Sequence, residues 1–287
     1  MAIVTLKEAL KGAEEGRYAV GMFNVLNIES MLAILMAAEE CSSPVILSLP
    51  EVDLWYVDSE ALIGIMYKKA SACTVPVVLH YDHGHNMEFM KKLLDNGWTS
   101  LMIDESKRSF EENVELTSRV VDLACRYGAS VEGELGHVPG LEGSSVHEDA
   151  EKEYPYTGVD EACRFVKETG IDALAVAIGT IHGEYRSEPR LNFDRLEELY
   201  RNLKVPMVLH GGSGLSGGDF RKCISLGIRK INVFTEMVLE PGIAVRERLE
   251  SEPSWKMSYT DLMPMSVQAM KNVVVRNMEI FGSTGRA

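Results

Sequence analysis

Short runs of apolar residues recur along the chain, and longer stretches of mixed polarity separate them. Runs such as PVVLHY, ALAVAIG and PMVLH are hydrophobic at nearly every position, which is typical of parallel strands buried on both faces. The pattern predicts eight strands, over residues 18–24, 44–49, 76–81, 100–103, 130–135, 172–178, 206–209 and 230–234.

Amphipathic segments with helical periodicity lie between these runs. Four of them predict helices over residues 27–41, 87–96, 110–127 and 160–169. A glycine follows three of these helices, at Gly97, Gly128 and Gly170, where a left-handed cap would end the helix before the next strand.

Eight strands that alternate with helices predict an α/β fold, the (β/α)₈ or TIM barrel, with residues 1–287 as a single domain that ends in a C-terminal helical extension. A doubly wound sheet is the alternative, but it usually carries a glycine-rich turn after its first strand, and this chain has none there. The longest connection, residues 136–158, is expected to be a mobile loop over the barrel mouth.

Composition narrows the class of protein and of partner. The 287 residues are 46% hydrophobic and 25% charged, which fits a globular protein with a large core. Forty-three acidic and 29 basic residues give a formal net charge of −14, which disfavours nucleic acid and anionic membranes as partners. An anionic small substrate stays possible, because a metal ion or backbone amides can reverse the local sign.

The cysteines and the hydropathy pattern favour a cytoplasmic location. Cys41, Cys73, Cys125, Cys163 and Cys223 are far apart, odd in number and in no CxxC pair, so we expect buried thiols in a reducing compartment. Neither a signal peptide nor a run of 18 apolar residues occurs, so we expect no export and no membrane span.

Three histidines lie at predicted strand ends, in the segments LHYDHGH, AIGTIHGEY and VLHGGSG. A single histidine at a strand end is more often a hydrogen-bonded core residue than a ligand. In a barrel, however, His83, His182 and His210 would converge on one mouth, and each precedes a glycine that lets the backbone turn. Three imidazoles and an open position are typical of a catalytic zinc site.

Other polar residues near these ends admit several roles. We interpret His80 and His85 as structural or supporting residues, and His137 and His147 as parts of the long loop. Asp82 precedes a predicted ligand, so it is a salt-bridge partner, an orienting group for the ligand or a general acid/base.

Three carboxylates are expected on neighbouring strands. Glu132 and Glu134 are one strand period apart and point to the same side, and Asp104 follows the preceding strand. Carboxylates in a core need a cation. A basic side chain is the simpler partner, and a second metal ion is the more specific one.

The segment HGGSGLSGG at residues 210–218 predicts a glycine-rich turn from a strand into a helix. Its amides and the Ser213 hydroxyl would form an anion site. This is the usual phosphate position of TIM barrels, and Asn232 and Thr235 are the polar residues beside it. With the histidines, these residues indicate a metal-dependent lyase, isomerase or hydrolase that acts on a phosphorylated small molecule.

Nine segments resemble, in order and spacing, the class II fructose/tagatose-bisphosphate aldolase family, also called ketose-bisphosphate aldolases. They are GMFNVLN, HYDHGH, SLMIDES, SVEGELG, DALAVAIGTIHGEY, LNFDRL, VLHGGSG, GIRKINVFTE and FGSTGRA, and they extend over nearly the whole chain. The resemblance implies a zinc-dependent enzyme that reversibly cleaves a ketose phosphate or bisphosphate to dihydroxyacetone phosphate and an aldehyde.

The resemblance also implies the metal and proton-transfer residues. The zinc ligands match His83, His182 and His210. Asp82 matches the acid/base that moves the proton of the C4 hydroxyl, and Glu142, in PGLEG, matches the glutamate that serves the carbon that becomes nucleophilic. An alternative, buried metal site matches Asp104 and Glu134.

The implied mechanism uses zinc at the C2 carbonyl and C3 hydroxyl oxygens, where it stabilises the enediolate left when the C3–C4 bond breaks. The family has no Schiff-base lysine, and neither Lys107 nor Lys230 is placed as an amine nucleophile. A homodimer or homotetramer is expected, with Na⁺ or K⁺ near the phosphate. The expected substrate-binding residues are Asn24, Gly183, Gly211, Gly212, Ser213, Asn232, Val233, Phe234 and Thr235.

Several departures from the family pattern concern the aldehyde. Lys107 replaces a common histidine, Phe234 replaces a common small or polar residue, and residues 50–58 are bulky and acidic. No Arg or Lys of the kind that often binds the second phosphate lies between residues 261 and 270, so Lys107 or Arg108 would supply that charge. A non-standard or unphosphorylated aldehyde is therefore an alternative substrate.

Two other functions stay open at this point. One is a non-catalytic or accessory relative that binds a ligand or a partner subunit. The other is a metal-dependent epimerase or hydrolase on the same barrel, which would turn over a sugar phosphate without releasing a triose phosphate.

Overall fold

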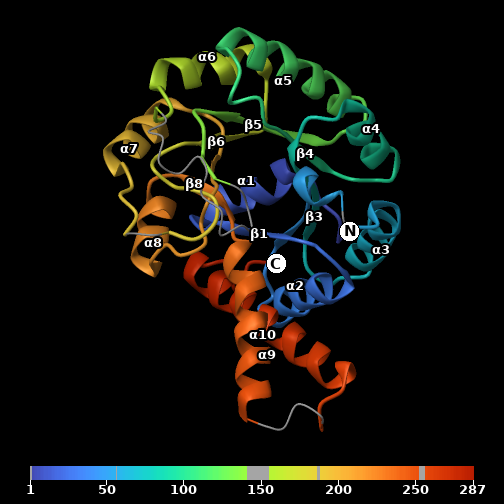
Figure 1. Cartoon of the computed structure of the whole chain (residues 1–287). Helices are drawn as coiled ribbons and strands as arrows, with labels where there is room; N and C mark the ends of the chain where they lie inside the picture. The colour runs from blue at the N-terminus through green and yellow to red at the C-terminus, as the bar shows by residue number, and fades with distance from the viewer. Residues whose placement is uncertain (1, 56, 141–154, 186–187, 252–255) are drawn as a thin grey trace.

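The computed structural model describes residues 2–55, 57–140, 155–185, 188–251 and 256–287. Eight parallel strands form a closed barrel in which each strand pairs with the next along the chain and the eighth pairs with the first. Helices surround this barrel (Figure 1). The arrangement confirms the predicted TIM barrel and excludes an open doubly wound sheet.

The strands lie within three residues of their predicted bounds. They are β1 (Val20–Asn24), β2 (Val45–Pro50), β3 (Val77–Gly84), β4 (Ser100–Ile103), β5 (Ser130–Leu135), β6 (Ala173–Val176), β7 (Met207–Leu209) and β8 (Ile228–Asn232). The helices are α1 (Leu6–Gly16), α2 (Ile28–Glu40), the 3₁₀ turn η1 (Glu51–Asp53), α3 (Ser59–Ser71), α4 (Met87–Asp95), α5 (Phe110–Cys125), α6 (Val159–Thr169), α7 (Phe193–Asn202), α8 (Gly217–Ser225), α9 (Thr235–Ser251) and α10 (Tyr259–Phe281).

Two strand boundaries differ from the prediction for a physical reason. β3 continues through polar residues to Gly84. These residues are largely buried at the barrel mouth, so the strand does not end where the apolar run ends. β8 begins and ends two residues earlier than predicted. The apolar Val233 and Phe234 lie beyond its end, in the turn that enters α9, where both are buried.

The barrel interior changes from apolar to polar along the strands. At the amino end α1 packs across the strand starts and closes the barrel, in an apolar cluster that includes Leu6, Leu10, Ala13, Met22, Ile46, Val78, Met102, Ala175 and Val208. Towards the carboxyl ends the buried residues are polar, namely Asn24, Ser48, His80, Asp82, Glu132, Glu134, His210, Lys230 and Asn232. The polar half of the barrel is where a site can form.

The C-terminal helices form the predicted extension. α9 and α10 pack against each other and reach away from the barrel, and α10 also packs against α2 (Figure 1). The end of the chain is fixed to the turn after α2: Ser43 Oγ donates to Ser283 Oγ at 2.8 Å, and the Ala287 N–H donates to the Ser42 carbonyl at 2.9 Å. The terminal FGSTGRA segment therefore has a structural role in the described part of the chain.

All five cysteines are free thiols, but the expectation that they are buried holds only for Cys41 and Cys223. Cys125 is exposed because it ends α5 on its outer side, and Cys73 and Cys163 are half-buried. Within the described residues, the helices are all too short or too polar to cross a bilayer.

A buried ion pair lies in the polar half of the barrel. Lys230 Nζ is 2.9 Å from Glu132 Oε2, and neither side chain is exposed to solvent. Burial opposes the charge of Glu132, but Lys230 and His210 outweigh it and lower the pKa of this carboxyl to about 2. Glu132 is therefore ionised at neutral pH and depends on Lys230 for its neutralisation.

We expect Lys230→Met to lower the free energy of unfolding by about 3 kcal/mol, because it leaves a buried carboxylate without its cation. Urea denaturation at pH 7 measures this loss. The double variant Lys230→Met/Glu132→Gln should regain part of it, and the exposed control Lys68→Met should change stability by less than about 0.5 kcal/mol. A double variant that is less stable than Lys230→Met alone would contradict this account.

Candidate active site

The three predicted histidines meet at the carboxyl end of the barrel. His83 is near the end of β3, His182 follows β6 and His210 directly follows β7. Each offers one ring nitrogen, and these atoms lie within 4.8 Å of one another. His83 Nε2 and His210 Nδ1 are only 3.0 Å apart, so the two rings present nitrogens to the same point.

Carboxylates orient two of these rings. Asp104 Oδ2 is 2.9 Å from His83 Nδ1, and Glu132 Oε1 is 2.9 Å from His210 Nε2. The other nitrogen of each ring is thereby left for a ligand, which is the arrangement that carboxylates impose on histidines around metals. Three imidazoles held in this way fit a zinc ion with an open coordination position.

The histidines differ in charge. Burial lowers the pKa of His182 and of His210, and the neighbouring His83 lowers both further. They therefore stay neutral, which is the form that binds a metal. Burial also opposes the charge of His83, but Asp82 and Asp104 outweigh it and hold the pKa of His83 well above its usual range.

Asp82 is a fully buried carboxylate beside these rings. Its Oδ1 is 3.5 Å from His80 Nε2, and its Oδ2 is 3.9 Å from His83 Nε2, so neither contact is a well-formed hydrogen bond. Burial opposes ionisation, but His83, His80 and Lys230 together hold the pKa of Asp82 well below its usual value. Asp82 is therefore ionised, and Asp104 is the carboxylate that orients the His83 ring.

A second set of ligands shares His83. His83, Asp104 and Glu134 each offer an atom within 4.8 Å of the others. Burial raises the pKa of Glu134 well above its usual value, and Asp104 raises it further. In the described residues no lysine or arginine pairs with Glu134 as Lys230 pairs with Glu132. The two alternative partners of a buried carboxylate therefore apply to different residues. Lys230 neutralises Glu132, and a metal ion fits Glu134.

The glycine-rich turn lies beside the histidines, between β7 and α8. Gly211 has a φ of 66°, and a Cβ there would be 2.3 Å from the Ile181 carbonyl oxygen, so another residue would displace the backbone. The Tyr185 hydroxyl donates to the Gly211 carbonyl at 2.9 Å and accepts from the Ile181 N–H at 3.1 Å. Tyr185 thus fixes the turn to the loop that carries His182.

Part of the predicted anion site is used by the protein itself. The Gly212 N–H donates to the Asn232 carbonyl at 3.2 Å, and Ser213 Oγ accepts from the Phe234 N–H at 3.2 Å. In the described part of the chain no carbonyl accepts from the N–H groups of Ser213 and Gly214. These two N–H groups and the Ser213 hydroxyl proton, and not the Gly212 N–H, are available to an anion.

A cavity of about 300 Å³ opens at this turn, and four of its lining residues are Gly183, Ser213, Gly214 and Thr235. Asn232 is buried beside it, with Nδ2 3.2 Å from His210 Nδ1. The side chains of Val233 and Phe234 instead pack into the core between the barrel and its outer helices. Phe234 is not among the residues that line this cavity.

A second cavity, of about 390 Å³, lies on the other side of the histidines. It includes His83, His182 and Asp104 and is completed by Val52, His85, Glu105, Lys107, Arg108, His137, Val138 and Gly140.

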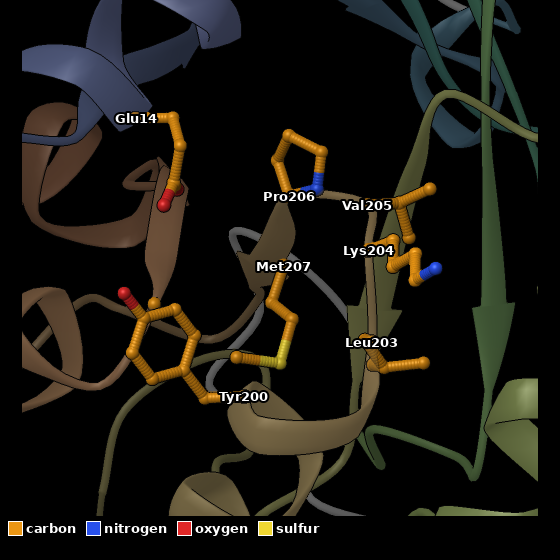
Figure 2. Close-up of a pocket in the computed structure, with 8 residues that line it drawn as sticks. Glu14, Tyr200, Leu203, Lys204, Val205, Pro206 and Met207 are labelled. Carbon is orange, nitrogen blue, oxygen red and sulfur yellow. The ribbon is translucent and has the colours of Figure 1, made fainter.

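A further hollow, of about 210 Å³, lies at the start of β7, beside Pro206 and Met207 (Figure 2). It contains none of the predicted functional residues and is at the amino end of the barrel, away from the site.

The other predicted residues are distributed as follows. Glu142 and His147 lie outside the described residues. His80 is buried and structural, with Nδ1 2.7 Å from Ser100 Oγ. His85 is largely exposed, whereas His137, in the segment that follows β5, is buried and lies 3.0 Å from Ser106 Oγ.

Sequence reasoning missed Glu51, which joins β2 to β3. Its Oε2 accepts from the Tyr81 hydroxyl at 2.7 Å and from the backbone N–H of His85. A single glutamate at the end of a strand carries no local signal of this role, because its partners are about thirty residues away in the sequence.

The chain matches known proteins over its whole length. A family model described as fructose-bisphosphate aldolase class-II matches residues 4–286. A probable fructose-bisphosphate aldolase of Bacillus subtilis is 42% identical over 100% of both chains, and a 6-phospho-5-dehydro-2-deoxy-D-gluconate aldolase of the same organism is 38% identical over 100% of this chain and 98% of its own.

The fold is also similar to that of a solved structure. The crystal structure of the YdjI aldolase from Escherichia coli K12 has a TM-score of 0.87 and 37% identity, over 99% of each chain. These matches agree with the barrel, the histidine cluster and the glycine-rich turn. The chain belongs to the class II fructose-bisphosphate aldolase family, whose members are lyases.

Proposed function

We propose that this protein is a zinc-dependent aldolase that reversibly cleaves a ketose phosphate to dihydroxyacetone phosphate and an aldehyde. The observation that carries the proposal is the position of Asp82: an ionised, buried carboxylate adjoins three converging imidazoles, and the cavity at the glycine-rich turn lies on the same mouth. Family membership supports the reaction class.

His83, His182 and His210 would hold the zinc ion. When bound, a zinc ion supplies Lewis-acid polarisation of the substrate's carbonyl and hydroxyl oxygens. Asp104 and Glu132 keep the rings oriented through their other nitrogens. The alternative set His83, Asp104 and Glu134 would offer a second position for the ion.

Groups of the protein itself bind the phosphate and transfer the protons. The N–H groups of Ser213 and Gly214 bind the phosphate of the dihydroxyacetone half, which fixes where C3 and C4 lie. The Asp82 carboxylate accepts the proton of the C4 hydroxyl, the C4–O bond becomes a carbonyl, and the C3–C4 bond breaks. The electron pair remains on the C3 fragment, and Glu142 would deliver the proton that completes dihydroxyacetone phosphate.

We expect Asp82→Asn to lower kcat by about 10²- to 10⁴-fold, because an amide cannot take up the C4 hydroxyl proton. Coupled detection of released dihydroxyacetone phosphate measures the rate, and atomic absorption measures bound zinc, which should stay near one ion per chain. Asp122→Asn, an exposed change on α5, is the matched control and should keep full activity. If Asp82→Asn lost zinc in parallel with activity, Asp82 would be a ligand-supporting residue instead.

We expect a chelator to abolish cleavage and added Zn²⁺ to restore it, because the class II family uses a metal where other aldolases use a Schiff-base lysine. His210→Ala should bind less zinc than the native protein, since it removes one of three ligands. Full activity after metal removal would exclude the proposal. Turnover of a sugar phosphate without release of dihydroxyacetone phosphate would indicate an epimerase or hydrolase.

A further inference from the structure

The 390 Å³ cavity lies across the histidine cluster from the glycine-rich turn. The closed strand order places β3 and β4 opposite β7 and β8, which hold that turn. The cavity is lined from the β3 and β4 ends by His85, Glu105 and Lys107, and it shares His83 and His182 with the cluster. A ketose phosphate that is bound by its phosphate at the turn therefore extends its other half into this cavity.

The acidic groups of this cavity are already neutralised by the protein. Glu105 is only 8% exposed, forms an ion pair with Arg108 and contacts His85 Nδ1 at 3.2 Å. Asp104 contacts His83 and accepts a hydrogen bond from Ser106 Oγ at 2.7 Å. Glu105 is therefore not available to a further cation.

Lys107 differs from the other basic groups that line the cavity. It is exposed, and no carboxylate of the described residues lies within ion-pair distance of its ammonium group. Arg108, its neighbour, is held by Glu105. In a protein with a net charge of −14, an uncompensated lysine at the edge of a cavity makes that cavity locally attractive to anions.

We propose that Lys107 determines specificity for the aldehyde half of the substrate, by selecting aldehydes that carry an anionic group, phosphate or carboxylate, at the end remote from the carbonyl. This inference rests on the aldolase function proposed above. The ammonium group is a mobile point charge with three donors, so it suits either anion, and such charge-assisted hydrogen bonds are stronger than neutral ones.

The test compares aldol addition of dihydroxyacetone phosphate to three aldehydes by the zinc-loaded protein. Glyceraldehyde 3-phosphate carries a phosphate, succinic semialdehyde carries a carboxylate, and glyceraldehyde is neutral. For Lys107→Met we expect the ratio of kcat/KM for the anionic to the neutral aldehyde to fall about tenfold, mainly through KM, because one charge-assisted contact is lost. The anion whose ratio falls further is the one that Lys107 recognises.

Two further variants control for charge and folding. Lys107→Arg keeps the cation and should retain most of the native ratio. Lys167→Met removes the same charge from the outer face of α6 and should leave the ratio unchanged. Circular dichroism and zinc content show whether each variant is folded and loaded.

Ionic strength gives a second, independent measurement. Raising salt from about 0.05 to 0.5 M should increase KM for the anionic aldehyde in the native protein more than in Lys107→Met, because an exposed charge contact is screened. Equal ratios in the native protein and Lys107→Met would overturn this inference alone. Absence of aldol addition with every aldehyde would overturn the proposed function, and this inference with it.

Discussion

The burial of charge inside a closed barrel is the constraint on which the site depends. Asp82, Glu132, Glu134 and Lys230 have no contact with solvent, and each unpaired charge in such an interior costs several kcal/mol. Lys230 neutralises Glu132, and Glu132 in turn contacts His210 on the side away from the ligand position. The requirement to neutralise a buried carboxylate therefore also fixes the orientation of the His210 ring.

The same constraint explains why the mouth favours a cation. Asp82 and Asp104 hold the pKa of His83 well above its usual range although burial opposes its charge. A field that favours a proton at this position also favours a metal ion there, and a metal binds by displacing that proton. The remaining carboxylate, Glu134, has no lysine or arginine partner within the described residues, so its ionisation depends on the charge that His83 and a bound ion provide.

The sequence predicted the barrel and the convergence of His83, His182 and His210 because both follow from local pattern: buried strands, and polar residues at their carboxyl ends. The sequence pattern did not predict the features that depend on contacts between residues far apart in the chain. β8 begins at Ile228, two residues before its predicted start, and the Arg229 side chain there is buried with its Nε bonded to Glu14 of α1, 215 residues away. That α1 closes the amino end of the barrel, and that Lys230 neutralises Glu132, follow from the closed topology and not from periodicity.

The juxtaposition of Asp82 and His83 shows how a local irregularity makes the site possible. In a regular strand adjacent side chains point to opposite faces, so an acid/base and a metal ligand could not be consecutive residues on one mouth. Here the pairing of β3 with β4 shifts register between Tyr81 and Gly84, and His83 has a left-handed φ of 48°. This conformation is costly for a residue with a Cβ, and it persists because Asp104 holds the ring. The strain turns His83 towards the side that Asp82 already faces, and the Asp82 carboxylate and the His83 imidazole thereby lie on the same mouth of the barrel.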